Sequence, residues 1–88
     1  MNKINEINLI EKWRLYESGK RFKKIRDEKL YPAGKSWTQF CMDNTDYDKR
    51  EIQRSIDFYE LCVAQGIVVE KPGNVPKIID DQFLLLDS

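Results

Sequence analysis

Residues 36–66 carry two helix-start signals in close succession, and they constrain the fold more than any other part of the chain. Ser36 is followed three residues later by Gln39, and Asp48 is followed three residues later by Glu51. Both pairs fit a capping box, in which the first side chain accepts a hydrogen bond from a backbone N–H and the second returns one. We therefore expect two capped helices separated by a tight polar turn.

Apolar residues inside this stretch recur at helical spacing. Trp37, Phe40 and Cys41 form an inward face of the first helix. The second helix ends at Gly66, which suits the left-handed residue that follows a helix. Its inward stripe consists of Ile52, Ile56, Tyr59 and Val63. The two helices, joined by the polar turn, predict a helix-turn-helix-like unit.

An amphipathic segment over residues 5–31 precedes this unit. Its apolar stripe includes Trp13 and resumes at Phe22, on a helical face rotated by more than about 90°. Gly19 lies where the apolar stripe moves from one helical face to the other. A glycine inside a helix lowers the stability of the helix by about 1 kcal/mol relative to alanine. We therefore expect either a kinked helix or two helices joined by a tight turn.

The C-terminal tail, residues 67–88, combines short apolar runs with turn signals. The β-branched runs 67–69 and 78–79 are separated by two prolines, a glycine and an asparagine, as in a small hairpin. The alternative is an extended tail packed over the helices. The apolar run 83–86 either closes the core or docks on another subunit.

Composition fits a single domain over residues 1–88, because 41% of the residues are hydrophobic and ten are aromatic. The predicted fold is all-α: a small helical bundle that contains the helix-turn-helix-like unit and ends in a short extended or hairpin tail. No apolar run approaches the roughly 20 residues of a membrane span, and no signal peptide is recognised, so we expect a cytoplasmic protein without a membrane partner. Cys41 and Cys62 fall on apolar faces and should be buried, reduced thiols.

The formal net charge is zero, but the charges are segregated. Residues 1–35 carry a net charge of +5, residues 36–66 carry −3, and residues 67–88 carry −2. Binding to phosphate requires local positive charge, whatever the total. The first predicted set of nucleic-acid or partner-binding residues therefore lies before Pro32; its members are Lys20, Arg21, Lys23, Lys24 and Arg26. The alternative is a solvated helix face.

The polar face of the second capped helix supplies the other predicted set, Lys49, Arg50, Gln53 and Arg54. Arginine and glutamine side chains have the donor geometry to recognise guanine and adenine edges in a groove of DNA. The alternative is that Arg54 pairs with Asp57, while Lys49 and Arg50 only solvate this face.

A family resemblance rests on three stretches: IRDEKLY at residues 25–31, SWTQFC at residues 36–41, and residues 50–61. The pattern resembles a module of phage, plasmid and bacterial proteins, and is similar to the helix-turn-helix region of plasmid-partition-type proteins. The resemblance covers about residues 20–66 and implies an all-helical, DNA-associated module of a mobile element. The chain departs from the family at the turn, where Asp46 and Asp48 stand in place of small or basic residues.

Catalysis is the function class that the sequence disfavours most, since it has no histidine and no recognisable nucleophile or phosphate-loop motif. We expect a non-enzyme with no catalytic residues, no cofactor, no metal site and no small-molecule substrate. The first functional hypothesis is a small DNA-binding regulator or accessory protein of a phage or mobile element, with duplex DNA as its partner. A homodimer is expected, because one such unit reads only a few base pairs. The alternative is an anti-CRISPR-like inhibitor that binds a host defence protein through the same scaffold.

Overall fold

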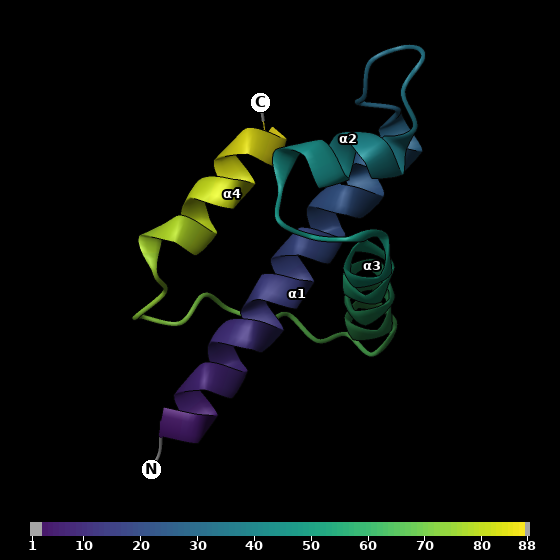
Figure 1. Cartoon of the computed structure of the whole chain (residues 1–88). Helices are drawn as coiled ribbons and strands as arrows, with labels where there is room; N and C mark the ends of the chain where they lie inside the picture. The colour runs from purple at the N-terminus through teal and green to yellow at the C-terminus, as the bar shows by residue number, and fades with distance from the viewer. Residues whose placement is uncertain (1–2, 88) are drawn as a thin grey trace.

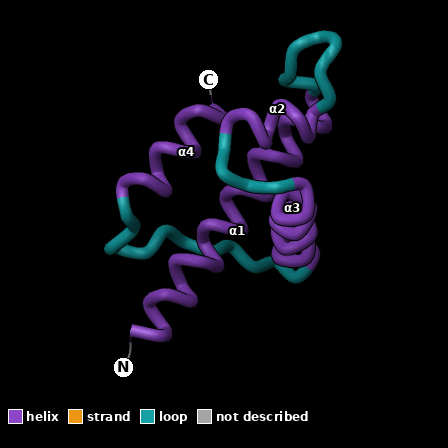
Figure 2. Tube along the Cα trace, viewed as in Figure 1, coloured by secondary structure: helices purple, strands orange, loops and turns teal. Residues whose placement is uncertain are grey.

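The computed structural model describes the backbone of residues 3–87 and the side chains of residues 9–81 and 83. Its helices are α1 (Lys3–Glu28), α2 (Trp37–Asn44), α3 (Lys49–Ala64) and α4 (Lys77–Asp87). α1 runs through the middle of the molecule, with α3 and α4 on different sides of it and α2 across one end (Figure 1). Loops join the helices, and the described backbone contains no strand (Figure 2). The predicted all-α bundle is confirmed. None of its described helices is both long and apolar enough to cross a bilayer.

Helices α1 and α3 cross in close contact at Gly19 and Ser55. A Cβ built on Gly19 would lie 2.0 Å from the carbonyl oxygen of Ser55 and 2.8 Å from the Cβ of Tyr59. Ser18, the neighbour of Gly19, is fully buried, as is Ser55. Small residues on both helices let the two backbones approach. The predicted alternative of two helices joined by a turn is therefore wrong, because α1 continues without interruption through Gly19.

The apolar stripe of α1 changes face along the helix because its two halves contact different parts of the fold. The ring of Trp13 meets the ring of Phe83 on α4 edge to face, with 5.3 Å between centroids. The ring of Phe22 meets Tyr47, also at 5.3 Å and edge to face. Such pairs add to the free energy gained by burying the rings themselves. The core cluster of buried residues is Trp13, Phe22, Ile25, Cys41, Tyr47, Ile52, Ile56 and Phe83.

Tyr47 anchors the connection between α2 and α3 to α1. Only 4% of its surface is exposed, and its hydroxyl forms a 2.7 Å hydrogen bond with the hydroxyl of buried Ser18. The guanidinium of Arg14 lies over its ring, 4.9 Å from the centroid. The sequence places Tyr47 in a polar turn, but its ring belongs to the core and only its backbone belongs to the turn.

Ser36 and Asp48 cap their helices as predicted, but of the two predicted capping boxes only the one at Asp48 is complete. The side chain of Gln39 donates to Asp43 at 2.7 Å instead of closing the box at Ser36. The hydroxyl of Ser36 accepts a hydrogen bond from the backbone N–H of Gln39 at 3.1 Å. Asp48 and Glu51 form a complete capping box: the Asp48 carboxylate accepts from the Glu51 N–H at 2.8 Å, and the Glu51 carboxylate accepts from the Asp48 N–H at 3.2 Å. Gly66 follows α3 with a φ of +71°, as expected of a glycine after a helix.

The predicted C-terminal hairpin is wrong, since α4 occupies most of that segment after an irregular stretch over residues 67–76. The carbonyl of Pro76 accepts from the N–H of Ile79 at 3.0 Å, at the start of the helix. Ile79 and Phe83 are four residues apart, so a helix brings both against the core cluster. An isolated two-stranded hairpin would gain much less from packing. Phe83 closes the core, whereas the side chains of residues 84–86 lie outside the described part.

Replacing Gly19 with alanine tests the close crossing. In an ordinary helix interior this change stabilises by about 1 kcal/mol. Here the new Cβ would overlap a backbone carbonyl, so α1 and α3 must move apart. We expect Gly19→Ala to lower the free energy of unfolding by about 2–3 kcal/mol, the usual cost of overpacking, as measured by urea denaturation.

Gly73→Ala is the matched control, because a Cβ at Gly73 meets nothing within 4 Å and its φ is not in the left-handed region. Its stability should stay within about 0.5 kcal/mol of the original protein. A Gly19→Ala protein as stable as the Gly73→Ala protein would contradict the close crossing.

The thiol of Cys41 provides a pH test of the core. Burial raises the pKa of this fully buried thiol to about 12 from an ordinary value near 9. Between these pH values the folded protein keeps a proton that the unfolded chain releases, so the free energy of unfolding should fall as pH rises through this window. In a Cys62→Ala variant, Ellman's reagent should label Cys41 at pH 8 only after urea is added. Rapid labelling of the folded protein would show that Cys41 is accessible.

Candidate nucleic-acid or partner interface

The first turns of α3 present opposite faces to the core and to solvent. Ile52 and Ile56 are fully buried. Arg50 and Arg54, also four residues apart, lie on the outer face and are exposed. The helix follows the four-residue connection, 45–48, and its start is fixed by the capping box. The sequence therefore predicted correctly that Arg50 and Arg54 face solvent.

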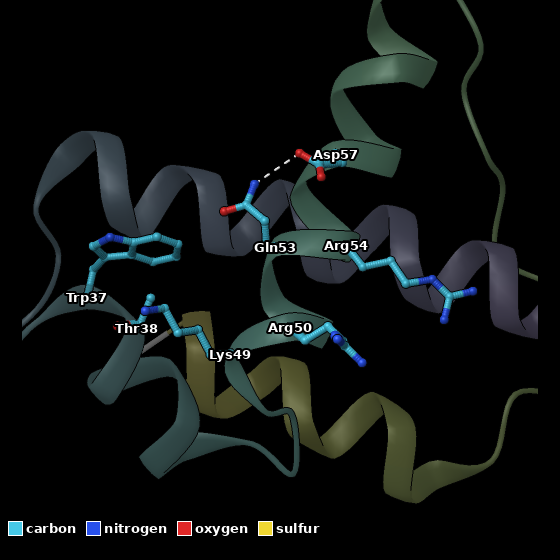
Figure 3. Close-up of a pocket in the computed structure, with 7 residues that line it drawn as sticks. All are labelled: Trp37, Thr38, Lys49, Arg50, Gln53, Arg54 and Asp57. Carbon is cyan, nitrogen blue, oxygen red and sulfur yellow. Dashed lines mark hydrogen bonds between the residues drawn. The ribbon is translucent and has the colours of Figure 1, made fainter.

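An open groove of about 660 Å³ runs between this outer face and the start of α2 (Figure 3). Lys49 reaches toward Trp37 and Thr38 at one side of the groove, whereas Arg50 and Arg54 extend away from them (Figure 3). All four members of the binding set predicted on α3 therefore line this groove together with residues of α2. The lining residues are Trp37, Thr38, Lys49, Arg50, Gln53, Arg54 and Asp57.

The cations of this groove are available for binding. Among the side chains that the structure describes, none forms an ion pair with Lys49, Arg50 or Arg54. The expected Arg54–Asp57 pair is not formed; the Asp57 carboxylate instead accepts a hydrogen bond from the Gln53 amide at 3.0 Å (Figure 3). The groove therefore presents exposed positive charge beside an amide whose orientation is held by a neighbouring carboxylate.

The positive charge of Arg54 also affects a carboxylate on α1. The carboxylate of Glu11 is bonded by Arg14, which holds the pKa of Glu11 below its ordinary value, and the charge of Arg54 adds a smaller effect in the same direction. A second groove, of about 460 Å³, begins at Arg54 and continues between α1 and α3 to Leu61. The outer face of α3 is thus bordered by a cationic groove at its start and, farther along, by a groove of mixed charged and apolar lining.

Carboxylates near the start of α3 have structural partners. Asp48 and Glu51 exchange hydrogen bonds with each other's backbone N–H groups. The carboxylate of Asp43, on α2, receives hydrogen bonds from Lys35 at 2.7 Å and from Gln39 at 2.7 Å, which lower its pKa. Among the described contacts of these three carboxylates, none is with Lys49, Arg50 or Arg54.

The basic segment of α1 meets this groove at Arg26, whose guanidinium lies 5.8 Å from the ring centroid of Trp37, and its other cations lie elsewhere. Arg21 packs over the ring of Phe83 on α4, 4.7 Å from its centroid. Lys23 and Arg26 both bind Asp27, at 2.8 and 3.0 Å. The remaining two cations of the predicted set, Lys20 and Lys24, are exposed. None of the five lines the groove.

Trp37 and Thr38 line the groove although the sequence did not mark them as binding residues. Trp37 was assigned to the core, and it does pack partly against the core cluster, with the Arg26 guanidinium 5.8 Å from its ring centroid. It is nevertheless only partly buried. The available signal was its position directly after the cap residue Ser36, since the first turn of a helix lies at the edge of the packed layer.

Comparisons with known proteins assign no family. No protein-family model matches the chain, no curated protein is significantly similar to it, and no solved structure is significantly similar to its fold. The resemblance to the helix-turn-helix region of plasmid-partition-type proteins therefore stays a prediction from the sequence.

Proposed function

We propose that the protein binds duplex DNA through the outer face of α3, as a small regulator or accessory protein of a phage or mobile element. The observation that carries the proposal is the exposed set Lys49, Arg50 and Arg54, which shares one groove with Gln53 and has no ion pair among the described side chains. Arginines bind phosphates and guanine edges, and a glutamine amide pairs with adenine.

The expected strength of binding follows from the number of cations. Three phosphate contacts give a slope of about −2.7 for the logarithm of the binding constant against the logarithm of salt concentration. Affinity should then fall about 40-fold between 50 and 200 mM salt. A homodimer that places two copies of α3 one helical turn of DNA apart would double the slope and extend the site.

A protein partner is the second candidate function, favoured by exposed apolar side chains beyond the cationic groove. Leu61 and Val63 are each 55% exposed, although Val63 was expected in the inward stripe, and Val68 in the following loop is 74% exposed. The groove between α1 and α3 includes Leu15, Phe58 and Leu61. An inhibitor of a host defence protein, of the anti-CRISPR kind, would use such a surface, and its binding would depend only weakly on salt.

Removing two groove cations tests the DNA proposal. A duplex is first selected from a random pool, and its affinity is measured by fluorescence anisotropy between 50 and 200 mM salt. Arg50→Ala/Arg54→Ala should weaken binding at least 20-fold at 50 mM salt and reduce the magnitude of the salt slope by about 2. Absence of any selected duplex, together with salt-insensitive capture of a protein, would instead support the second candidate.

Lys20→Ala/Lys24→Ala is the matched control, since it removes the same charge from exposed positions of α1 that do not line the groove. It should weaken binding less than three-fold at 50 mM salt, an effect of net charge alone. An equal loss from the two double variants would show diffuse electrostatic attraction rather than a binding face on α3.

Changing Asp48 to asparagine separates its capping role from its charge. Asparagine caps a helix about as well as aspartate, so the melting temperature should be nearly unchanged. The loss of one negative charge beside Lys49 and Arg50 should tighten binding to the selected duplex about two-fold, the size of one charge–charge interaction through water. An unchanged affinity of a folded Asp48→Asn protein would place the DNA elsewhere on the molecule.

A further inference from the structure

The groove between α2 and α3 contains an aromatic wall that the binding of a fully paired duplex does not use. Trp37 is the first residue of α2 and is partly buried, with one part packed against the core cluster and another lining the groove. Lys49 reaches toward it from the start of α3 (Figure 3). An indole beside a cation forms a surface suited to a flat, aromatic group that carries negative charge.

Gln53 adds a hydrogen-bonding group to the same groove. One N–H of its amide is used by Asp57 at 3.0 Å, which fixes the orientation of the side chain. A glutamine amide has two N–H donors and a carbonyl acceptor, so the second N–H and the oxygen remain for a ligand. An aromatic wall, a fixed amide and cations within one groove match the base and the flanking phosphates of a nucleotide.

The accessibility of the base decides which form of nucleic acid fits. Within a duplex the faces of the bases are stacked on each other, and only their edges and the phosphates meet a protein. An unpaired base offers a free face that stacks on aromatic side chains. We infer that the groove lined by Trp37, Lys49 and Gln53 receives one unpaired base of DNA, stacked on Trp37, with its flanking phosphates on the cations of α3.

This inference rests on the proposed DNA binding and makes it more specific: the protein prefers DNA that contains an unpaired stretch to a perfect duplex. Lys49 and Arg50 supply the charge that holds the backbone, and Trp37 supplies the preference for an unpaired base. Base stacking on one aromatic side chain changes affinity about ten-fold, which is therefore the expected preference.

The experiment uses the full chain and three fluorescein-labelled DNAs of equal length: a single strand, its duplex, and the duplex with a central unpaired bubble. Trp37→Leu should weaken binding to the single strand and to the bubble about ten-fold and leave duplex binding within two-fold. Trp37→Phe, which keeps a ring, should recover most of the loss. Tyr31→Leu is the matched control, because Tyr31 also packs against the core cluster but does not line the groove. It should bind all three DNAs as the original protein does.

A second measurement needs no substitution that affects folding. Trp13 is 4% exposed and contacts Phe83 and Lys71, away from the groove. A change of tryptophan fluorescence on binding therefore reports on Trp37. Saturating single-stranded DNA should quench the emission of the original protein, and the quenching should disappear in Trp37→Phe.

The outcomes distinguish this inference from the proposed function. Binding to the duplex with no preference for the bubble and no quenching would overturn the inference and leave DNA binding by α3 intact. Equal losses for all three DNAs in Trp37→Leu would mean that Trp37 only supports α3. No binding to any of the three DNAs would overturn the proposed function and the inference together.

Discussion

At Gly19 the backbones of α1 and α3 approach so closely that the carbonyl oxygen of Ser55 occupies the space of a side chain. This contact fixes the position of α3 along α1 more narrowly than apolar packing alone, because any larger residue would force the helices apart. α2 is joined to α3 by only four residues, so the position of α2 follows. The groove between α2 and α3 therefore depends on a contact on the opposite side of α3.

A buried polar contact completes this arrangement. The hydroxyls of Tyr47 and Ser18 bond at 2.7 Å, and an unpaired buried hydroxyl would be costly, so this pairing favours one register of the connection against α1. Burial raises the pKa of the Tyr47 hydroxyl, while the hydrogen bond to Ser18 and the charge of Arg14 act in the opposite direction. Tyr47 thus holds the α2–α3 connection against α1, and Gly19 holds α3 itself against α1 at Ser55.

The sequence correctly predicted features that depend on residues close together in the chain. It mispredicted features that depend on contacts between residues far apart in the chain. The caps at Ser36 and Asp48 and the outward face of α3 were predictable, because each follows from residues three or four positions apart. Gly19 was interpreted as a kink or as a turn between two helices, since its partner Ser55 lies far along the chain. The β-branched residues 78–79 predicted a strand, whereas the contact of Phe83 with Trp13 favours a helix. Of the two predicted sets of binding residues, the set on α3 lies in one groove, whereas the set on α1 is distributed around a helix whose neighbours the sequence did not show.

The acidic residues around the start of α3 have structural roles in the folded protein. Asp48 and Glu51 interact with the backbone N–H groups at the start of α3, where the helix dipole favours negative charge. Asp57 holds the amide of Gln53. Part of the negative charge of residues 36–66 thus lies at the start of α3 and beside Gln53, and Lys49, Arg50 and Arg54 are exposed, as are Asp48 and Asp57. Because a phosphate responds to the charges that are nearby and exposed, the proposed DNA binding depends on the arrangement of charges on this face and not on the net charge of the segment.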